Sequence, residues 1–97
     1  MHADGEPSWS ILGGELYWES WECEHAVFHS LSGETHLLPD FTALVLRKMG
    51  DGACTARELA MIVCSEIGDP CDENFVMGIT RLLRQLQAVG LVEPSVT

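Results

Sequence analysis

Lysine and arginine are missing from the first forty positions of this 97-residue chain. The same segment holds eight acidic residues: Asp4, Glu6, Glu15, Glu19, Glu22, Glu24, Glu34 and Asp40. Five basic against fifteen acidic residues give the whole chain a formal net charge of −10. Nucleic acids and anionic membranes are bound through lysine and arginine, so we expect neither as a partner. The charge favours a basic partner, or it simply keeps the protein soluble.

The chain also has no long apolar run. No stretch approaches the roughly 20 apolar residues that a membrane helix needs. Residues 1–6 have neither the basic start nor the apolar core of a secretory signal, so we expect a cytoplasmic protein. In that compartment thiols stay reduced, and no disulfide is expected among the four cysteines, which are Cys23, Cys54, Cys64 and Cys71.

The motifs that mark most catalytic and metal sites are missing as well. The sequence has no phosphate-binding glycine loop, no His-Glu-x-x-His and no Gly-x-Ser-x-Gly, so we predict a protein that is not an enzyme. Cys23, His25 and His29 alternate along one stretch, but strand residues two positions apart are separated by about 6.5 Å, which suits shared metal ligands poorly. We therefore expect no metal and no cofactor.

The composition along the chain indicates three parts. A flexible N-terminal arm is expected over residues 1–14, where four glycine and proline residues occur, with Trp9 or Ile11 as its points of contact with the body. One folded domain follows over residues 15–93, and residues 94–97 form a tail. Residues 91–93 are expected to return to the body as an extended segment.

Three short strands are predicted at the start of the domain. In the first, Leu16 and Trp18 point to one face and Tyr17 points to the other, and Trp21 continues the strand after a shift of face. β-Branched and aromatic residues predict a second strand over 26–29. A glycine-containing turn leads to a third strand over residues 35–38, which the following proline ends.

Three amphipathic helices follow the strands. Asp40 is expected to cap the first and Asp72 the third, while Thr55 and Glu58 form a capping box for the second. Glycines are expected to end the helices, at Gly50–Gly52, Gly68 and Gly90. Three strands followed by three helices indicate an α+β domain, with a helix–turn–helix formed by the second and third helices.

Three strings in the sequence are similar to one known family. They are Val27-Phe28-His29-Ser30-x-Ser32-Gly33-Glu34-Thr35-His36-Leu37-Leu38, then Gly52-x-x-Thr55-x-x-Glu58-Leu59-Ala60, and finally Leu86-x-x-x-Gly90-Leu91-Val92. Together they resemble the PqqD-like peptide chaperones, also called recognition elements of ribosomally made and modified peptides, in the branch named after the HPr-rel-A system. The resemblance covers residues 16–92, about four-fifths of the chain.

The resemblance implies a winged helix–turn–helix-like fold and a peptide-binding role. The leader of a precursor peptide would add as a strand beside the third strand, and the domain would present it to a modifying enzyme. Carried onto this sequence, the peptide-binding edge is Thr35, His36, Leu37 and Leu38. The opposing wall on the third helix is Val76, Thr80, Leu83 and Gln87, with the border of Gly78, Gln85 and Val89 as the alternative.

Several interpretations stay open at this point. Val76 and Leu83 are either wall or plain core, and His36 either contacts the peptide or bonds to a main-chain carbonyl. A winged-helix DNA-binding regulator is a second reading, although the third helix begins with two acidic residues that would face phosphates. A small scaffold subunit of a larger enzyme is a third. An open sheet edge also allows a homodimer.

Overall fold

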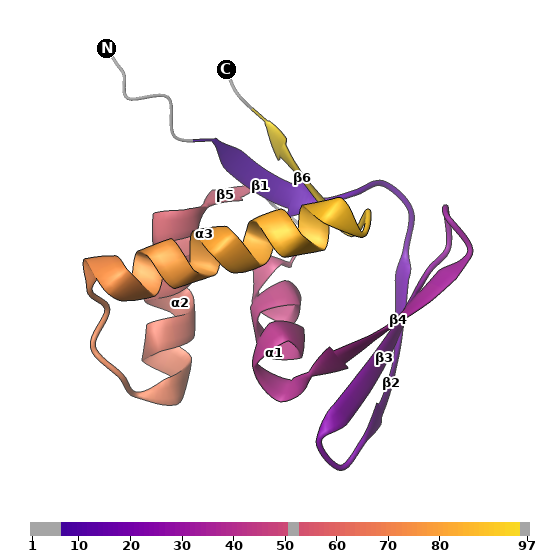
Figure 1. Ribbon diagram of the computed structural model, residues 1–97, viewed down its shortest axis with the longest axis horizontal. Coiled ribbons are helices and arrows are strands. Elements are labelled where there is room, and N and C mark those ends of the chain that lie inside the picture. Colours follow the sequence, from indigo (N-terminus) through magenta and orange to yellow (C-terminus); the bar gives the residue numbers. More distant parts are fainter. Residues whose placement is uncertain (1–6, 51–52, 96–97) are drawn as a thin grey trace.

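The computed structural model describes residues 7–50 and 53–95 and has an α+β architecture (Figure 1). Three helices combine with two three-stranded antiparallel sheets, so the predicted α+β class is confirmed. The expected order of three strands and then three helices is only partly right. Three further strands occur, one before the predicted sheet, one between the first two helices and one after the last helix.

The first sheet is built from segments that are distant in sequence. Strand β1 (Ser8–Ile11) lies in its centre, between β5 (Cys54–Thr55) and β6 (Val92–Ser95). The Trp9 side chain in β1 is only 3% exposed, and Trp9 is opposite Pro94. The predicted flexible arm is therefore wrong for residues 8–11, although the expected contact of Trp9 with the body is present, and the predicted tail is wrong for residues 94–95. The parts of those two predictions at residues 1–6 and 96–97 lie outside the described residues.

The second sheet is a meander of β2 (Leu16–Trp21), β3 (Glu24–His29) and β4 (Glu34–Pro39). Its inner face packs on the helices and consists of Leu16, Trp18, Ser20, His25, Val27, His29, Glu34, His36 and Leu38. Its outer face consists of Tyr17, Glu19, Trp21, Glu24, Ala26, Phe28, Thr35, Leu37 and Pro39. The predicted alternation in β2 is confirmed, but Trp21 needs no shift of face, because the β2–β3 register is continuous as far as its pair with Glu24.

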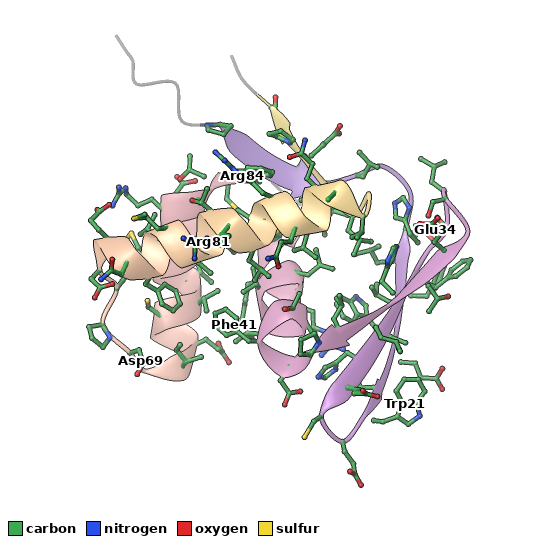
Figure 2. All side chains as sticks on the ribbon, in the orientation of Figure 1. Trp21, Glu34, Phe41, Asp69, Arg81 and Arg84 are labelled. Carbon is green, nitrogen blue, oxygen red and sulfur yellow. The ribbon has the colours of Figure 1, made fainter. Side chains whose placement is uncertain are left out.

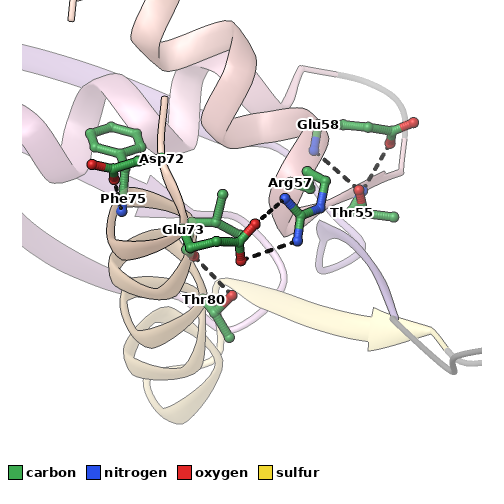
Figure 3. Close-up of polar contacts among 8 residues, drawn as sticks. Thr55, Arg57, Glu58, Asp72, Glu73, Phe75 and Thr80 are labelled. Atoms are coloured by element: carbon green, nitrogen blue, oxygen red, sulfur yellow. Dashed lines mark hydrogen bonds and ion pairs between the residues drawn. The ribbon is translucent and has the colours of Figure 1, made fainter. Parts of the chain in front are cut away.

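The helices are α1 (Asp40–Met49), α2 (Ala56–Ile67) and α3 (Glu73–Ala88). Figure 3 shows two of the predicted caps: the Glu58 N–H donates to Thr55 Oγ1 at 3.1 Å, and the Phe75 N–H donates to Asp72 Oδ1 at 2.9 Å. The predicted Asp40 cap is wrong, because Pro39 occupies the N-cap position and Asp40 is the first helical residue. Its carboxylate instead accepts a hydrogen bond from a histidine of β3.

Gly90 ends α3 as predicted. Its φ of 84° lies in the left-handed region, and its N–H donates to the Gln87 carbonyl at 3.0 Å while the Leu91 N–H donates to the Leu86 carbonyl at 3.0 Å. These two bonds form a Schellman motif, which turns the chain sharply back. The turn sends the last segment into β6, where it pairs with β1. For the first helix, Gly50 is the C-cap residue, and the two other residues of its predicted stop, at positions 51 and 52, lie outside the described residues.

One core joins the helices to both sheets. α3 lies across α1 and α2 in Figure 1, and α2 packs against both of the other helices. The buried cluster takes Trp9 from the first sheet, Val27 and Leu38 from the second, and the apolar faces of all three helices, with Leu46, Leu59, Val63, Ile79 and Leu83 among its members. In the described part of the chain, every helix is too short or too polar to cross a bilayer.

Candidate functional site

Strand β4 has a free edge. Within residues 7–50 and 53–95 it pairs with β3 only, so its other side carries main-chain groups without a strand partner. Exposed sheet edges are usually protected against pairing with other chains, because the edge strand is short or carries proline or charged residues. The edges of the first sheet fit this rule, because β5 has two residues and β6 contains Pro94. β2 carries Glu19 in its middle, whereas the middle of β4 carries Leu37, whose side chain is 66% exposed.

The hydrogen-bond register shows which groups of β4 face outward. The Ser30 N–H donates to the Glu15 carbonyl at 2.9 Å, one pair beyond the β2–β3 ladder. Bonded and non-bonded pairs alternate along an antiparallel ladder. Phe28, Ala26 and Glu24 therefore bond toward β2, and the residues between them bond toward β4. It follows that the N–H and C=O groups of Thr35 and Leu37 point to the open edge, whereas the carbonyl of Pro39, the N-cap residue of α1, accepts the first hydrogen bond of that helix.

The position of Pro39 agrees with this assignment. Proline has no N–H, so within a sheet it is tolerated where that position faces solvent rather than a neighbouring strand. Pro39 is opposite Glu24 at the end of β4, two residues from Leu37 and therefore on the same side of the ladder. The strand thus presents two complete donor–acceptor pairs, one at Thr35 and one at Leu37.

The side chains of the predicted edge alternate between the two faces. Thr35 and Leu37 lie on the outer face, and Leu38 is buried on the inner face. His36 also lies on the inner face, where its Nε2 atom is buried without a hydrogen-bond partner among the described residues and lies 3.6 Å from Glu34 Oε1. The predicted bond to a main-chain carbonyl is therefore not made by this nitrogen.

The predicted wall on α3 is not brought to β4. Val76 and Leu83 are buried in the core, and Thr80 Oγ1 donates to the Val76 carbonyl of its own helix at 3.1 Å. Gln87 lines a cavity of about 420 Å³ together with Pro7, Trp9, Arg84 and Pro94. That part of α3 therefore faces the first sheet.

An aromatic pair marks the opposite side of α3. Phe41, two residues after the end of β4, packs edge-to-face on Phe75 with ring centroids 6.1 Å apart, and it is 42% exposed. In Figure 2, Phe41 and Arg84 lie on opposite sides of α3. Helix geometry places the alternative border, which contains Gly78 and Val89, nearer to this pair. Phe41 has the helical spacing of the apolar residues of α1, so the sequence pattern alone does not reveal that its ring is exposed.

A chain of polar contacts joins the second sheet to α1. The Arg47 guanidinium donates to Ser20 Oγ at 3.1 Å, Ser20 Oγ lies 2.7 Å from His25 Nδ1, and His25 Nε2 lies 2.6 Å from Asp40 Oδ1. Arg47 also lies over the Trp18 ring, with its central carbon 4.3 Å from the ring centroid. A carboxylate only accepts, so His25 Nε2 carries the proton and Ser20 donates to Nδ1 when the ring is neutral.

Serine hydrolases use the same three residue types, with the serine on Nε2 and the acid on Nδ1. Here the two nitrogens are exchanged, and an arginine donates to the serine oxygen. The contacts link β2 and β3 to the helix that follows β4. We assign the set a structural role, because it holds the second sheet against α1 and so fixes the end of the open edge.

Both ring nitrogens of His29 are hydrogen-bonded to main-chain groups of the protein. It is 1% exposed, its Nε2 donates to the Gly13 carbonyl at 2.7 Å, and its Nδ1 accepts from the Ser32 N–H at 3.3 Å. The two imidazoles of the candidate metal set, His25 and His29, are thus both engaged by protein groups. Among residues 7–50 and 53–95 there is no group of three histidine, cysteine, aspartate or glutamate side chains that could hold a metal ion.

The cysteine side chains that the structure describes are all free thiols. Cys64 in α2 is buried, and burial together with a hydrogen bond to the Cys71 thiol raises the pKa of Cys64 to about 11. A thiol with such a pKa is almost entirely protonated at neutral pH, and the thiolate is the nucleophilic form. Cys64 therefore acts as a packing residue.

No family model, curated protein or solved structure matches the chain. The likeness to PqqD-like peptide chaperones thus stays a prediction from the sequence. The free edge of β4 and the aromatic pair beside it are the features from which a function can be argued.

Proposed function

We propose that the protein is a peptide-binding adaptor. It captures the leader of a ribosomally made precursor peptide by strand addition to β4 and presents it to a modifying enzyme. The observation that carries the proposal is the set of outward main-chain groups at Thr35 and Leu37, on an edge that no described strand covers. We also propose that α2, α3 and the second sheet correspond to the helix–turn–helix and wing of the PqqD-like fold.

Strand addition explains how such an edge binds a peptide. Each main-chain hydrogen bond contributes only about 0.5–1.5 kcal/mol net, so the few bonds that Thr35 and Leu37 offer give modest and sequence-tolerant affinity. Side-chain pockets must supply the remaining affinity and the selectivity. A peptide running along β4 reaches Phe41 at the end of the strand, and we propose that the Phe41–Phe75 pair replaces the predicted α3 wall of Val76, Thr80, Leu83 and Gln87.

His36 supports the same site. Buried polar atoms are almost always hydrogen-bonded, and an unsatisfied one calls for an explanation. Its Nε2 lies in the middle of the edge strand on the inner face. The side chains of an added strand also alternate between the faces, so a peptide side chain with an acceptor oxygen beside His36 would satisfy this nitrogen.

DNA binding is not favoured. The first turn of α3, which would enter the major groove in a helix–turn–helix protein, carries Asp72 and Glu73, and Glu73 is already paired with Arg57. The chain has a net charge of −10, which opposes contact with phosphates.

The proposal is tested by an NMR titration of amide shifts with a synthetic leader segment from a short precursor encoded beside this gene. We expect shifts at Thr35, Leu37 and around Phe41. Leu37→Pro removes an outward N–H while leaving the β3–β4 ladder intact, so we expect it to abolish binding with little loss of stability. Leu37→Ala is the matched control, because it shortens the same side chain but keeps the N–H.

Two outcomes would contradict the proposal. Unchanged affinity of a folded Leu37→Pro variant would exclude strand addition at β4. No shifts with several candidate leaders at high concentration would favour a scaffold subunit that contacts a folded partner.

A further inference from the structure

The outer face of the second sheet is apolar although no described part of the chain covers it. Tyr17, Trp21 and Leu37 are each more than half exposed on this face, and Phe28 is 38% exposed. A sheet that packs on a core with one face normally shows polar residues on the other. Contiguous exposed apolar surface of this kind marks a docking surface.

Three glutamates lie beside the apolar side chains, and we call them the acidic frame. Glu19 and Glu24 lie on the outer face itself, and Glu15 accepts a hydrogen bond from the Tyr17 hydroxyl at the end of β2. The same pairing with Glu15 raises the pKa of Tyr17, since a nearby carboxylate disfavours the phenolate. None of the residues on the outer face is basic. The face therefore offers aromatic rings and carboxylates without a cation of its own.

We propose that the outer face docks an arginine-bearing surface of a partner protein. A guanidinium stacks on an aromatic ring and donates to a carboxylate at the same time, which the compact lysine ammonium does poorly. The inner face of the same sheet shows ring stacking combined with hydrogen-bond donation within the chain, where Arg47 lies over Trp18 and donates to the Ser20 hydroxyl rather than to a carboxylate. On the outer face, Trp21 is opposite Glu24, so a ring and a carboxylate are adjacent there.

Charge decides against the other occupants. A second copy that docked through the same face would place one acidic frame against another, because each copy has a net charge of −10 and no basic residue on this face. An anionic membrane would be repelled for the same reason. An arginine-bearing protein surface supplies both the charge and the planar group that the face lacks.

This docking surface goes beyond the proposed peptide site. The leader would bond to the edge of β4, whereas the partner would cover the flat face centred on β2 and β3. Both surfaces meet at Leu37, so a partner docked on the outer face would lie beside a captured leader. The two proposals fail separately, because Leu37→Pro removes strand addition and leaves Trp21, Glu19 and Glu24 in place.

The test uses the full chain and a short blocked peptide in which arginine alternates with glycine, with its lysine and glutamate counterparts as controls. We expect the arginine peptide to shift amides of Tyr17, Glu19, Trp21 and Phe28, and to bind more tightly than the lysine peptide. Trp21→Ala should weaken binding about two- to fivefold, the range for an exposed cation–π contact. The double substitution Glu19→Gln with Glu24→Gln should weaken it as well, and Glu93→Gln in β6 should not.

A fluorescence measurement tests the same surface without a peptide. Trp9 is buried and Trp18 is half-buried beside Arg47, so Trp21 is the most exposed of the three tryptophans. In an acidic frame the caesium cation should quench Trp21 more strongly than the iodide anion, and Trp21→Phe should remove the difference.

Three results would overturn the proposal. The first is equal binding of the arginine and lysine peptides without dependence on Trp21, which would mean charge attraction alone. The second is the absence of shifts on the outer face with the arginine peptide. The third is self-association of the chain that Trp21→Ala abolishes, which would show a second copy to be the occupant.

Discussion

His25 in β3 and Asp40 at the first turn of α1 are joined by a hydrogen bond of 2.6 Å between Nε2 and Oδ1. The two residues are fifteen positions apart, and the bond closes the connection between the second sheet and the helix that follows it. It also explains why Asp40 does not cap α1, since its carboxylate is already used by the imidazole. The sheet is therefore held against α1 at the point where the open edge of β4 ends.

Replacing Asp40 should loosen this connection. We expect Asp40→Asn to lower the free energy of unfolding by about 1 kcal/mol, because a charge-assisted hydrogen bond at a largely exposed carboxylate is replaced by a neutral one. Urea unfolding followed by circular dichroism measures the change. Asp69→Asn, at an exposed aspartate after α2, is the matched control and should be close to neutral; an equal loss in both variants would contradict the assigned role.

His29 and His36 of the second sheet differ in their hydrogen bonding, so replacing each of them should change the free energy of unfolding differently. His29→Leu leaves the Gly13 carbonyl and the Ser32 N–H without a partner, so we expect a loss of about 2 kcal/mol or more in unfolding free energy. His36→Leu removes a buried nitrogen that has no hydrogen-bond partner among the described residues and only a 3.6 Å contact with the exposed Glu34 carboxylate, and we expect no loss or a small gain. The same chemical denaturation compares them. Equal destabilisation would show that His36 is bonded after all.

Alanine substitutions at Gly14 and Gly33 distinguish the cost of backbone strain from the cost of steric crowding. Both have positive φ, of 102° and 76°, but a Cβ at Gly14 would lie 2.9 Å from Leu31 Cβ, whereas a Cβ at Gly33 would meet open space. We expect Gly33→Ala to cost about 1 kcal/mol from conformation alone. Gly14→Ala should cost about 2–3 kcal/mol, because overpacking adds to the strain. Thermal unfolding of both variants measures the difference, and similar midpoints would show that the β1–β2 connection relaxes freely.

The ion pair between Arg57 and Glu73 predicts a pH dependence (Figure 3). The Arg57 guanidinium lowers the pKa of Glu73 below its ordinary value of 4.5. A carboxyl whose pKa is lowered by folding stabilises the folded state above its unfolded pKa, and this stabilisation is lost as the pH falls through the folded pKa. We therefore expect Glu73→Gln to unfold at a lower temperature than the parent at neutral pH.

The difference between Glu73→Gln and the parent should shrink once the pH falls below about 4.5 and then vanish. Because both side chains are exposed, the effect will be small and will be reduced by salt. Melting curves at several pH values and two salt concentrations measure it. A difference that stays constant down to acidic pH would mean that Glu73 acts through packing rather than charge.

The local patterns in the sequence were sufficient to predict the three helices and the three strands of the second sheet. Thr55 with Glu58 and Asp72 with Phe75 form the caps that their spacing predicts, and Gly90 has the left-handed conformation that ends α3. These features depend on residues within one turn of each other, so the sequence pattern contains all the information they need. The exception is Asp40, because its side chain is hydrogen-bonded to His25, which is fifteen positions away in the sequence.

The candidate site was only half predictable. The stretch from Thr35 to Leu38 forms an edge strand as expected, because a turn and a proline bound it on either side. Which residues of α3 are buried and which border the two sheets depends on how the helix is rotated in the core. Val76 and Leu83 point into the core and Gln87 points toward Trp9 and Pro94, and hydrophobic periodicity alone does not separate the two borders of the apolar face.

The sequence by itself determined the acidic balance, the alternation of β2 and the starts and ends of α2 and α3, since charge, periodicity and capping are local properties. Only the tertiary structure decided that Trp9 is buried, that β1 lies between β5 and β6, and that the outer face of the second sheet stays uncovered. The physical reason is that pairing of β1 with β6 joins residues from the two ends of the chain. A four-residue strand is too short for its hydrophobic periodicity to predict which strand it pairs with. The burial of Trp9 stabilises the pairing, and that burial is a property of the tertiary structure.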